Sequence, residues 1–172
     1  VTLKHEKPYE IEHYIVNNFG RNSLAPISDI DRPFTPAELN DFSKDPLVFL
    51  GNHTDNHAIL TNLSPSEMKL EIDSSQNFIF KLTGLKPIMI AYPNGNFSEE
   101  VLKVTKKSGL KLGICTNPKK NLLPLDLKGL QSFSLNRFIL KGNESIERQC
   151  NAFRSDIQFL NFVRKLWVGK VN

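Results

Sequence analysis

Residues 46–57, PLVFLGNHTDNH, join a short apolar run to two histidines that stand four residues apart. The run LVFLGN (residues 47–52) predicts a β-strand, and because it is continuously apolar we expect both of its faces to be covered. His53 and His57 follow at the point where this strand would end. In α/β folds the residues just past a strand's carboxyl end are the usual place for a site. The stretch therefore predicts a buried strand that leads into a candidate site.

Helices and strands alternate along the rest of the chain. The capping sequences TPAE (residues 35–38) and SPSE (residues 64–67) predict helix starts, and Gly20, Gly84 and Gly109 predict helix ends. The predicted helices are at about 8–19, 36–42, 64–82, 98–108 and 146–163, and the predicted strands are at 47–52, 87–92, 110–116 and 130–140. This alternation predicts parallel strands joined by crossovers, which is an α/β fold.

Composition excludes several classes of protein. The chain has 172 residues, 40% of them apolar and 23% charged, which is ordinary for one globular domain. Its net charge of +4 is spread along the chain, and its short basic clusters lack interleaved aromatic residues, so nucleic acid is not an expected partner. No run approaches the roughly 20 apolar residues of a membrane span. Cys115 and Cys150 are expected to be free thiols in the core, which leaves the cellular compartment open.

The histidine spacing allows a metal site. If residues 53–57 form a turn of helix, His53 and His57 share one face and can reach one ion. The spacing equals that of the zinc-protease motif, but Thr54 stands where that motif has its general base. A metal would need a further ligand, for which a carboxylate is suited. The alternative is that both histidines only hydrogen-bond a loop. Thr54 is placed to anchor the turn or to contact a substrate.

A second candidate segment, AYPNGN (residues 91–96), follows the predicted strand at 87–92. Pro93 and the Asn94–Gly95 pair predict a tight turn, and Gly95 would let a ligand come close. A backbone N–H at this turn could stabilise an oxyanion. The alternative is an ordinary loop between a strand and a helix.

Taken together, these segments resemble the polysaccharide deacetylases with a NodB-type domain, carbohydrate esterase family 4. HTDNH matches the family's His-Ser/Thr-x-x-His metal motif, and AYPNGNFSEEVL (residues 91–102) and KKSGLKLGICT (residues 106–116) match its later strands and turn. The order and spacing hold across about residues 35–140. The resemblance implies an incomplete or irregular (β/α) barrel in a single domain, with an irregular N-terminal part (residues 1–34) and a core (residues 35–172).

The resemblance also implies an activity, the metal-dependent hydrolysis of N-acetyl groups on a sugar polymer or oligosaccharide. His53 and His57 would be the metal ligands, for zinc in the first place, with other transition metals open. The backbone of Asn94 would contact the oxyanion. The residues implied in binding the acetylated glycan are Thr54, Tyr92, Pro93 and Arg137.

The sequence also departs from the family. No Asp-Asp pair occurs in it, although the family carries one on its first strand, and no late histidine occurs in SFSLNRF (residues 132–138). Ala91 stands where many members have an arginine, and Asn94 stands where a tyrosine is usual. The remaining acidic candidates for a base are Asp29 and Asp31. Two hypotheses therefore stay open, an enzyme and a catalytically incomplete domain that binds carbohydrate or metal.

The start of the chain and the edge of the predicted barrel raise two further questions. Val1 is not a methionine and no signal-peptide pattern follows it, so a processed chain and a fragment of a longer enzyme both stay open. With few predicted strands, the barrel would have an open edge. We expect a partner chain, including a second copy in a homo-oligomer, or the N-terminal helix to cover this edge.

Overall fold

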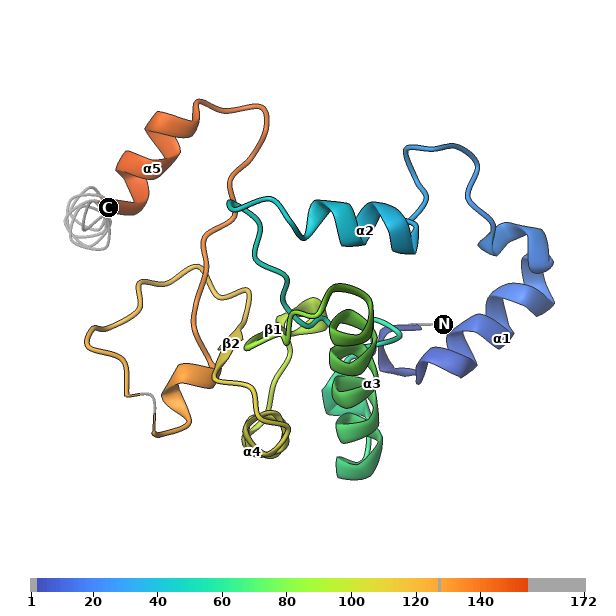
Figure 1. The fold of residues 1–172 in the computed structure, drawn as a ribbon, viewed down its shortest axis with the longest axis horizontal. Coiled ribbons are helices and arrows are strands. Elements are labelled where there is room, and N and C mark those ends of the chain that lie inside the picture. Colours follow the sequence, from blue (N-terminus) through green and yellow to red (C-terminus); the bar gives the residue numbers. More distant parts are fainter. Residues whose placement is uncertain (1–2, 127, 155–172) are drawn as a thin grey trace, which may run out of the picture. The chain divides into compact units, whose positions relative to one another are not determined.

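The structure, a computed structural model, describes residues 3–126 and 128–154. The chain divides into two compact units, residues 1–137 and residues 138–172, and each is described by itself. The helices of the first unit are α1 (Pro8–Phe19), α2 (Pro36–Phe42), α3 (Pro65–Thr83) and α4 (Glu99–Lys107), and its strands are β1 (Met89–Ala91) and β2 (Leu112–Ile114) (Figure 1). The second unit contains α5 (Ile146–Arg154). Whether the chain forms a single domain stays a prediction.

The helices of the first unit begin and end close to the predicted residues. At α2 the Thr35 hydroxyl accepts a hydrogen bond from the Glu38 N–H (3.3 Å), and the Glu38 carboxylate accepts one from the Thr35 N–H (2.7 Å). Ser64 and Glu67 make the same reciprocal pair at α3. Gly84 ends α3 in the left-handed conformation, with its N–H donating to the Phe80 carbonyl (2.8 Å). The caps satisfy backbone groups that a helix end leaves without partners, which is why these bounds can be read locally.

The strands are parallel. β1 pairs with β2 so that Met89 lies opposite Leu112 and Ala91 lies opposite Ile114. Single parallel bridges continue the pairing on both sides, from Asn52 to β1 and from β2 to Leu135. Parallel strands between helices confirm the predicted α/β class. Because the strands are parallel, their carboxyl ends meet at one edge, which brings the segments after residues 52 and 91 together. The barrel stays a prediction.

Two predicted strands are much shorter than expected. Within residues 47–52 only Asn52 pairs with another strand, and Leu47 and Phe49 are 93% and 60% exposed, so the expectation of a strand covered on both faces is wrong. Within residues 130–140 only Leu135 pairs, after a 3-10 turn at Gln131–Phe133. A strand needs a neighbouring backbone, and the described residues supply one only at these single positions. Residues 155–163 of the predicted last helix lie outside the described residues.

The core lies between the sheet and the helices α3 and α4, which lie beside the two strands (Figure 1). Its buried members are Leu60, Met68, Ile72, Ile90, Tyr92, Val101, Leu102, Val104, Leu110, Cys115 and Phe133. The Tyr92 hydroxyl donates a hydrogen bond to the Phe133 carbonyl (2.8 Å), and burial raises the pKa of Tyr92 to about 12. A Cβ on Gly113 would lie 2.3 Å from this hydroxyl, so β2 needs glycine for the contact.

Both cysteines are free, as predicted, and Cys115 lies in this core, whereas Cys150 is half-buried.

In the second unit, the rings of Phe138 and Phe153 stack with their centroids 4.3 Å apart. Gln149 holds the start of α5 to the preceding segment by accepting from the Lys141 N–H (2.7 Å) and donating to the Lys141 carbonyl (2.9 Å). In the described part of the chain, no helix combines the length and the apolar character that a membrane crossing needs.

Candidate functional site

The two histidines lie together at the carboxyl edge of the sheet. Their ring centroids are 4.8 Å apart, with an interplanar angle of 74°. Residues 53–57 form an irregular loop, and not the turn of helix that would have placed both histidines on one helix face. Thr54 and His57 adopt the left-handed region, with φ of 65° and 52°. The loop therefore brings the rings together by a strained backbone path, and not by helical spacing.

One ring nitrogen of His53 is fixed by the neighbouring strand. Nδ1 of His53 lies 2.6 Å from the Ala91 carbonyl oxygen at the end of β1. A carbonyl can only accept a hydrogen bond, so Nδ1 carries the proton in the neutral ring and Nε2 keeps its lone pair. Histidines that bind metals usually donate their second ring N–H in this way. The position at Ala91 thus supplies a backbone carbonyl that orients His53.

Side chains before and within the loop hold its shape. Asn52, only 1% exposed, donates from Nδ2 to the Ile72 carbonyl (2.8 Å) and accepts from the Thr54 N–H (2.8 Å). The Thr54 hydroxyl accepts from the Ala58 N–H (2.9 Å), and Thr54 is 8% exposed. Of the two roles expected for Thr54, the structure shows the anchoring one. Its contact with a substrate stays a prediction.

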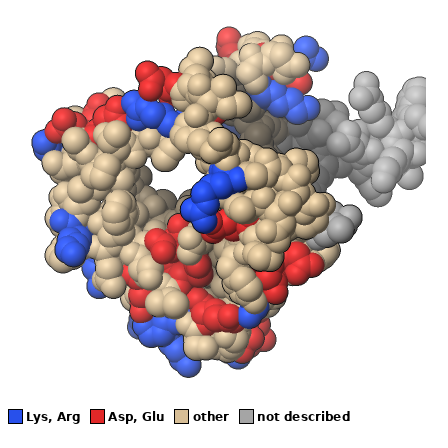
Figure 2. Space-filling model, turned by 90° about the vertical axis from the view of Figure 1, so that its right-hand side faces the viewer, with Lys and Arg blue, Asp and Glu red and all other residues tan. Residues whose placement is uncertain are grey.

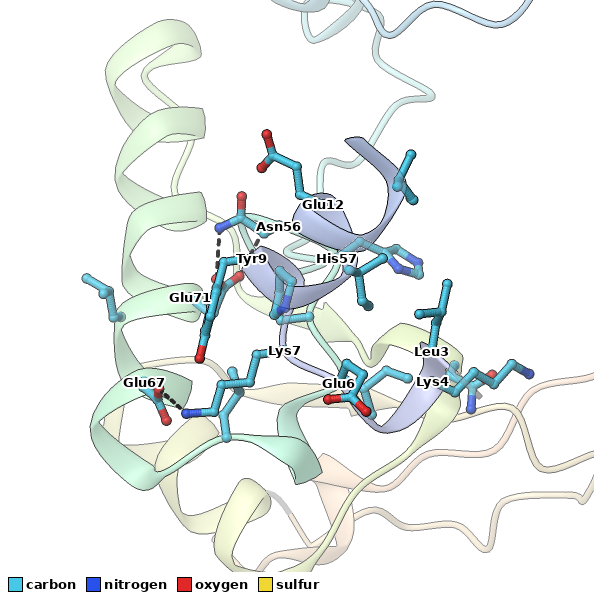
Figure 3. A pocket seen from close by; sticks show the side chains of 18 of the residues that line it. Leu3, Lys4, Glu6, Lys7, Tyr9, Glu12, Asn56, His57, Glu67 and Glu71 are labelled. Atoms are coloured by element: carbon cyan, nitrogen blue, oxygen red, sulfur yellow. Dashed lines mark hydrogen bonds and ion pairs between the residues drawn. The ribbon is translucent and has the colours of Figure 1, made fainter. Parts of the chain in front are cut away.

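Glu71 on α3 also contacts the loop, and sequence reasoning missed it. Its carboxylate accepts a hydrogen bond from the Asp55 N–H (3.0 Å). It also accepts from the Asn56 N–H (2.9 Å) and the Asn56 side-chain amide (2.9 Å) (Figure 3). Asn52 could have been noticed because it stands next to His53 in the sequence. Glu71 carries no such signal, because it follows Asn56 by fifteen residues and looks like any polar position of an amphipathic helix.

The turn after β1 places Asn94 near the histidines. Asn94 is exposed, with φ of 57°, and lines the same cavity as His57. At Gly95, with φ of 75°, a Cβ would lie 2.1 Å from the Thr116 hydroxyl oxygen. The nearest neighbour that excludes a Cβ is therefore Thr116, and the approach of a ligand at Gly95 stays a prediction.

The remaining predicted residues lie in different surroundings. Tyr92 and Pro93 are buried in the core, where they fix the start of the turn that carries Asn94. Arg137 is exposed, two residues after the single bridge at Leu135. The structure thus brings His53, His57 and the turn at Asn94 together at one edge of the sheet. Substrate contacts by Tyr92, Pro93 and Arg137 stay predictions.

A cavity of about 790 Å³ opens beside His57 and Asn94. Its walls come from the N-terminal residues and α1 on one side and from α3 and the loop at residues 56–59 on the other (Figure 3). Apolar walls include Ile11, Ile59 and Leu63; the acidic ones are Glu6, Glu12, Glu67 and Glu71. The face that carries α1 is hollowed, and acidic side chains gather beside the hollow (Figure 2).

One ion pair joins the two walls of this cavity. Lys7 Nζ lies 2.6 Å from the Glu67 carboxylate. The hydrogen bonds from Lys7 and Ser64 lower the pKa of Glu67 to about 2, so this carboxylate is charged at neutral pH.

The donor set fits a divalent metal ion in part. The free Nε2 of His53 and a ring nitrogen of His57 can supply two ligands of the kind that zinc takes. Within residues 3–126 and 128–154, no group of three or more His, Cys, Asp or Glu side chains could hold an ion. Asp31 accepts from the Ile27 and Ser28 N–H groups, which lowers its pKa, and Asp29 pairs with Arg32 (2.9 Å). Both aspartates are thus engaged within their own loop.

The chain belongs to the polysaccharide deacetylase family, whose family model matches residues 9–113. The resemblance drawn from HTDNH and the later strands is thereby confirmed. Among curated relatives, the chain is 38% identical over 61 residues to the peptidoglycan-N-acetylmuramic acid deacetylase PdaA of Bacillus subtilis (strain 168), covering 35% of this chain and 23% of PdaA. The chain spans a quarter or less of the length of the curated relatives it matches.

Solved structures of the same kind have a similar fold. The Streptococcus pyogenes deacetylase PplD, in complex with acetate, aligns with a TM-score of 0.61 and 26% identity, covering 73% of this chain and 53% of PplD. BC0361, a polysaccharide deacetylase from Bacillus cereus, aligns with a TM-score of 0.63 and 17% identity, covering 83% of this chain and 46% of BC0361. The α/β fold is therefore that of polysaccharide deacetylases.

Proposed function

We propose that this chain binds a divalent metal ion through His53 and His57 and takes part in the hydrolysis of N-acetyl groups on a sugar polymer or oligosaccharide. The observation that carries the proposal is the hydrogen bond from His53 to the Ala91 carbonyl, beside the ring of His57. This arrangement leaves Nε2 of His53 available to a metal. Membership of the polysaccharide deacetylase family supports the reaction class.

Each residue at the site has a proposed task. A bound ion would lower the pKa of a water molecule and polarise the acetyl carbonyl. Zinc is the first candidate because both ligands are imidazoles, with other transition metals open. The backbone N–H of Asn94 would donate to the oxygen on which negative charge develops. Thr54 keeps the loop in shape, and the exposed Arg137 would contact the glycan. The buried Tyr92 and Pro93 would act through the turn that carries Asn94.

For the fold, we propose that the parallel backbone segments at Asn52, β1, β2 and Leu135 are part of an irregular (β/α) barrel. Their shared direction and the likeness to solved deacetylases support this. In such barrels the site lies at the carboxyl ends of the strands, which is where His53 and Asn94 lie.

Metal binding can be tested with the chain's own histidines. The His53→Ala, His57→Ala double variant should lose bound zinc, measured by titration calorimetry and elemental analysis. His5→Ala, His13→Ala is the matched control, because it removes the other two histidines of the chain and should keep full binding. Equal zinc content in the two double variants would contradict the proposal.

The second candidate function is a catalytically incomplete domain that binds carbohydrate or metal. The observation that favours it is the lack, among the described residues, of a carboxylate grouped with the two histidines. An assay on N-acetylglucosamine oligomers separates the candidates. Acetate release that depends on zinc supports the enzyme, whereas zinc binding without acetate release supports the incomplete domain.

A further inference from the structure

We propose that Glu71 is a positioning residue that holds the loop at residues 54–57 and so sets the separation of the two imidazoles. The inference deepens the proposed function, on which it rests for its consequence in metal binding. It concerns a residue outside the histidine motif, on a different element. Glu71 lies on α3, whereas the histidines follow the segment that ends at Asn52.

The hydrogen bonds of Glu71 account for both of its carboxylate oxygens. Oε2 accepts from the backbone N–H groups of Asp55 (3.0 Å) and Asn56 (2.9 Å), and Oε1 accepts from Asn56 Nδ2 (2.9 Å). Two consecutive N–H groups converge on one oxygen, which fixes the direction of the chain just before His57. A carboxylate accepts such bonds at both oxygens without a competing donor of its own.

The backbone on both sides of these contacts needs such support. Thr54 and His57 have φ of 65° and 52°, a region that side chains with a Cβ rarely adopt and that is particularly unfavourable for the β-branched Thr54. Strained conformations persist only where the surrounding contacts determine them. Hydrogen bonds with Asn52 and Ala58 restrain Thr54, and hydrogen bonds with Glu71 restrain Asp55 and Asn56. Without Glu71, the loop can relax and carry His57 away from His53.

The helix that carries Glu71 is a fixed reference. Its neighbour Ile72 is fully buried, and the Ile72 carbonyl accepts the side-chain hydrogen bond of Asn52. The same turn of α3 therefore holds the residue before His53 through the Ile72 carbonyl and the residue before His57 through the Glu71 carboxylate. The distance between the two histidines is thus set by one rigid element.

The alternative is that the negative charge of Glu71 acts directly, as a metal ligand or a base. This alternative predicts a different result for substitutions at position 71. A glutamine at position 71 keeps an oxygen for the two backbone N–H groups, and its amide group can donate to the Asn56 side-chain oxygen after rotation of the Asn56 amide. Glu71→Gln should therefore preserve the loop, whereas Glu71→Ala should not. If the charge acted directly, the two variants would fail alike.

The first measurement needs no metal. In the metal-free full chain, nuclear Overhauser contacts between the His53 and His57 rings should be present in the unsubstituted protein and in Glu71→Gln, and lost in Glu71→Ala. Asp73→Asn on the same helix is the matched control and should keep the contacts. Zinc affinity should fall about 10–100-fold in Glu71→Ala, as for other residues that orient metal ligands, and stay close to the original in Glu71→Gln.

A second pair of variants, which exchanges the carboxylate of residue 71 and the amide of residue 56, keeps the test decisive if Glu71→Ala does not fold. Asn56→Asp places two carboxylates against each other and should abolish the ring contacts, and adding Glu71→Gln should restore them. Ring contacts that persist in Asn56→Asp and in a folded Glu71→Ala would overturn the inference, as would failure of Glu71→Gln. Failure of the proposed function would appear separately. In that case the His53→Ala, His57→Ala variant would bind zinc as well as the unsubstituted chain.

Discussion

At Gly95, the backbone conformation and a neighbouring side chain both disfavour any residue with a Cβ. Its φ is 75°, and a Cβ would meet the Thr116 hydroxyl oxygen at 2.1 Å. Gly84 has nearly the same conformation, with φ of 72°, but a Cβ there would meet nothing within 4 Å. Substitutions at Gly84 and Gly95 therefore separate the free-energy cost of the left-handed conformation from the cost of the steric clash.

We expect Gly84→Ala to lower the free energy of unfolding by about 1–2 kcal/mol, the cost of a left-handed residue with a Cβ. Gly95→Ala should lose about 1–3 kcal/mol more, because Thr116 must also move. Denaturant unfolding of both variants measures the difference. Equal losses would show that Thr116 yields without cost, and would remove the steric explanation of Gly95.

The candidate site shows what a sequence can and cannot predict about single residues. The spacing of His53 and His57 predicted that both could reach one ion if the segment formed a turn of helix, but their rings meet through an irregular loop. The actual path depends on left-handed backbone at Thr54 and on Glu71 from a distant helix, and both depend on tertiary contacts. Local spacing therefore identified the pair, and could not identify what holds it.

Among the elements, α3 begins at a cap that depends on a charged group. The Glu67 carboxylate accepts from Ser64 and pairs with Lys7, and these contacts lower its pKa from the ordinary 4.5 to about 2. A carboxylate whose pKa is lower in the folded state stabilises that state above its unfolded pKa. This stabilisation is lost as the pH falls from 4.5 towards 2.

We therefore expect the free energy of unfolding to fall less steeply between pH 4.5 and pH 2 in Glu67→Gln than in the unsubstituted chain. The measurement is denaturant unfolding at several pH values across this range. Glu100→Gln, at an exposed position in the first turn of α4, is the control and should keep the original slope. Parallel curves for the Glu67 variant and the unsubstituted chain would contradict the assignment.

Helices were easier to predict than strands for a physical reason. The caps at Thr35, Ser64 and Gly84 act within a few residues, so the sequence near each helix end contains its cause. A strand is completed by a backbone that is distant in the sequence. For residues 47–52 and 130–140, apolar composition predicted strands, whereas pairing occurs only at Asn52 and Leu135.

At the scale of the whole molecule, several large apolar side chains in the segment at residues 24–49 are exposed. The exposed ones are Leu24, Ile27, Ile30, Phe34, Phe42, Leu47 and Phe49. Ile27 and Ile30 are 94% and 96% exposed, and Leu47 is 93% exposed. Exposed apolar surface of this kind favours association, and residues 47–49 also lead into the single bridge at Asn52. This is the surface on which the predicted cover by a partner or a second copy can be tested.

We expect the chain to associate with itself in a concentration-dependent way, and Leu47→Lys, Phe49→Lys to weaken this association without a loss of stability. Both side chains are exposed, so replacing them removes little buried area, whereas two added charges repel a second copy. Sedimentation of both proteins over a range of concentrations gives the association constant, and thermal unfolding gives the stability. Leu122→Lys is the control, because Leu122 is 89% exposed but lies outside residues 24–49. If the Leu122 variant weakened association as much, general charge and not this segment would govern it.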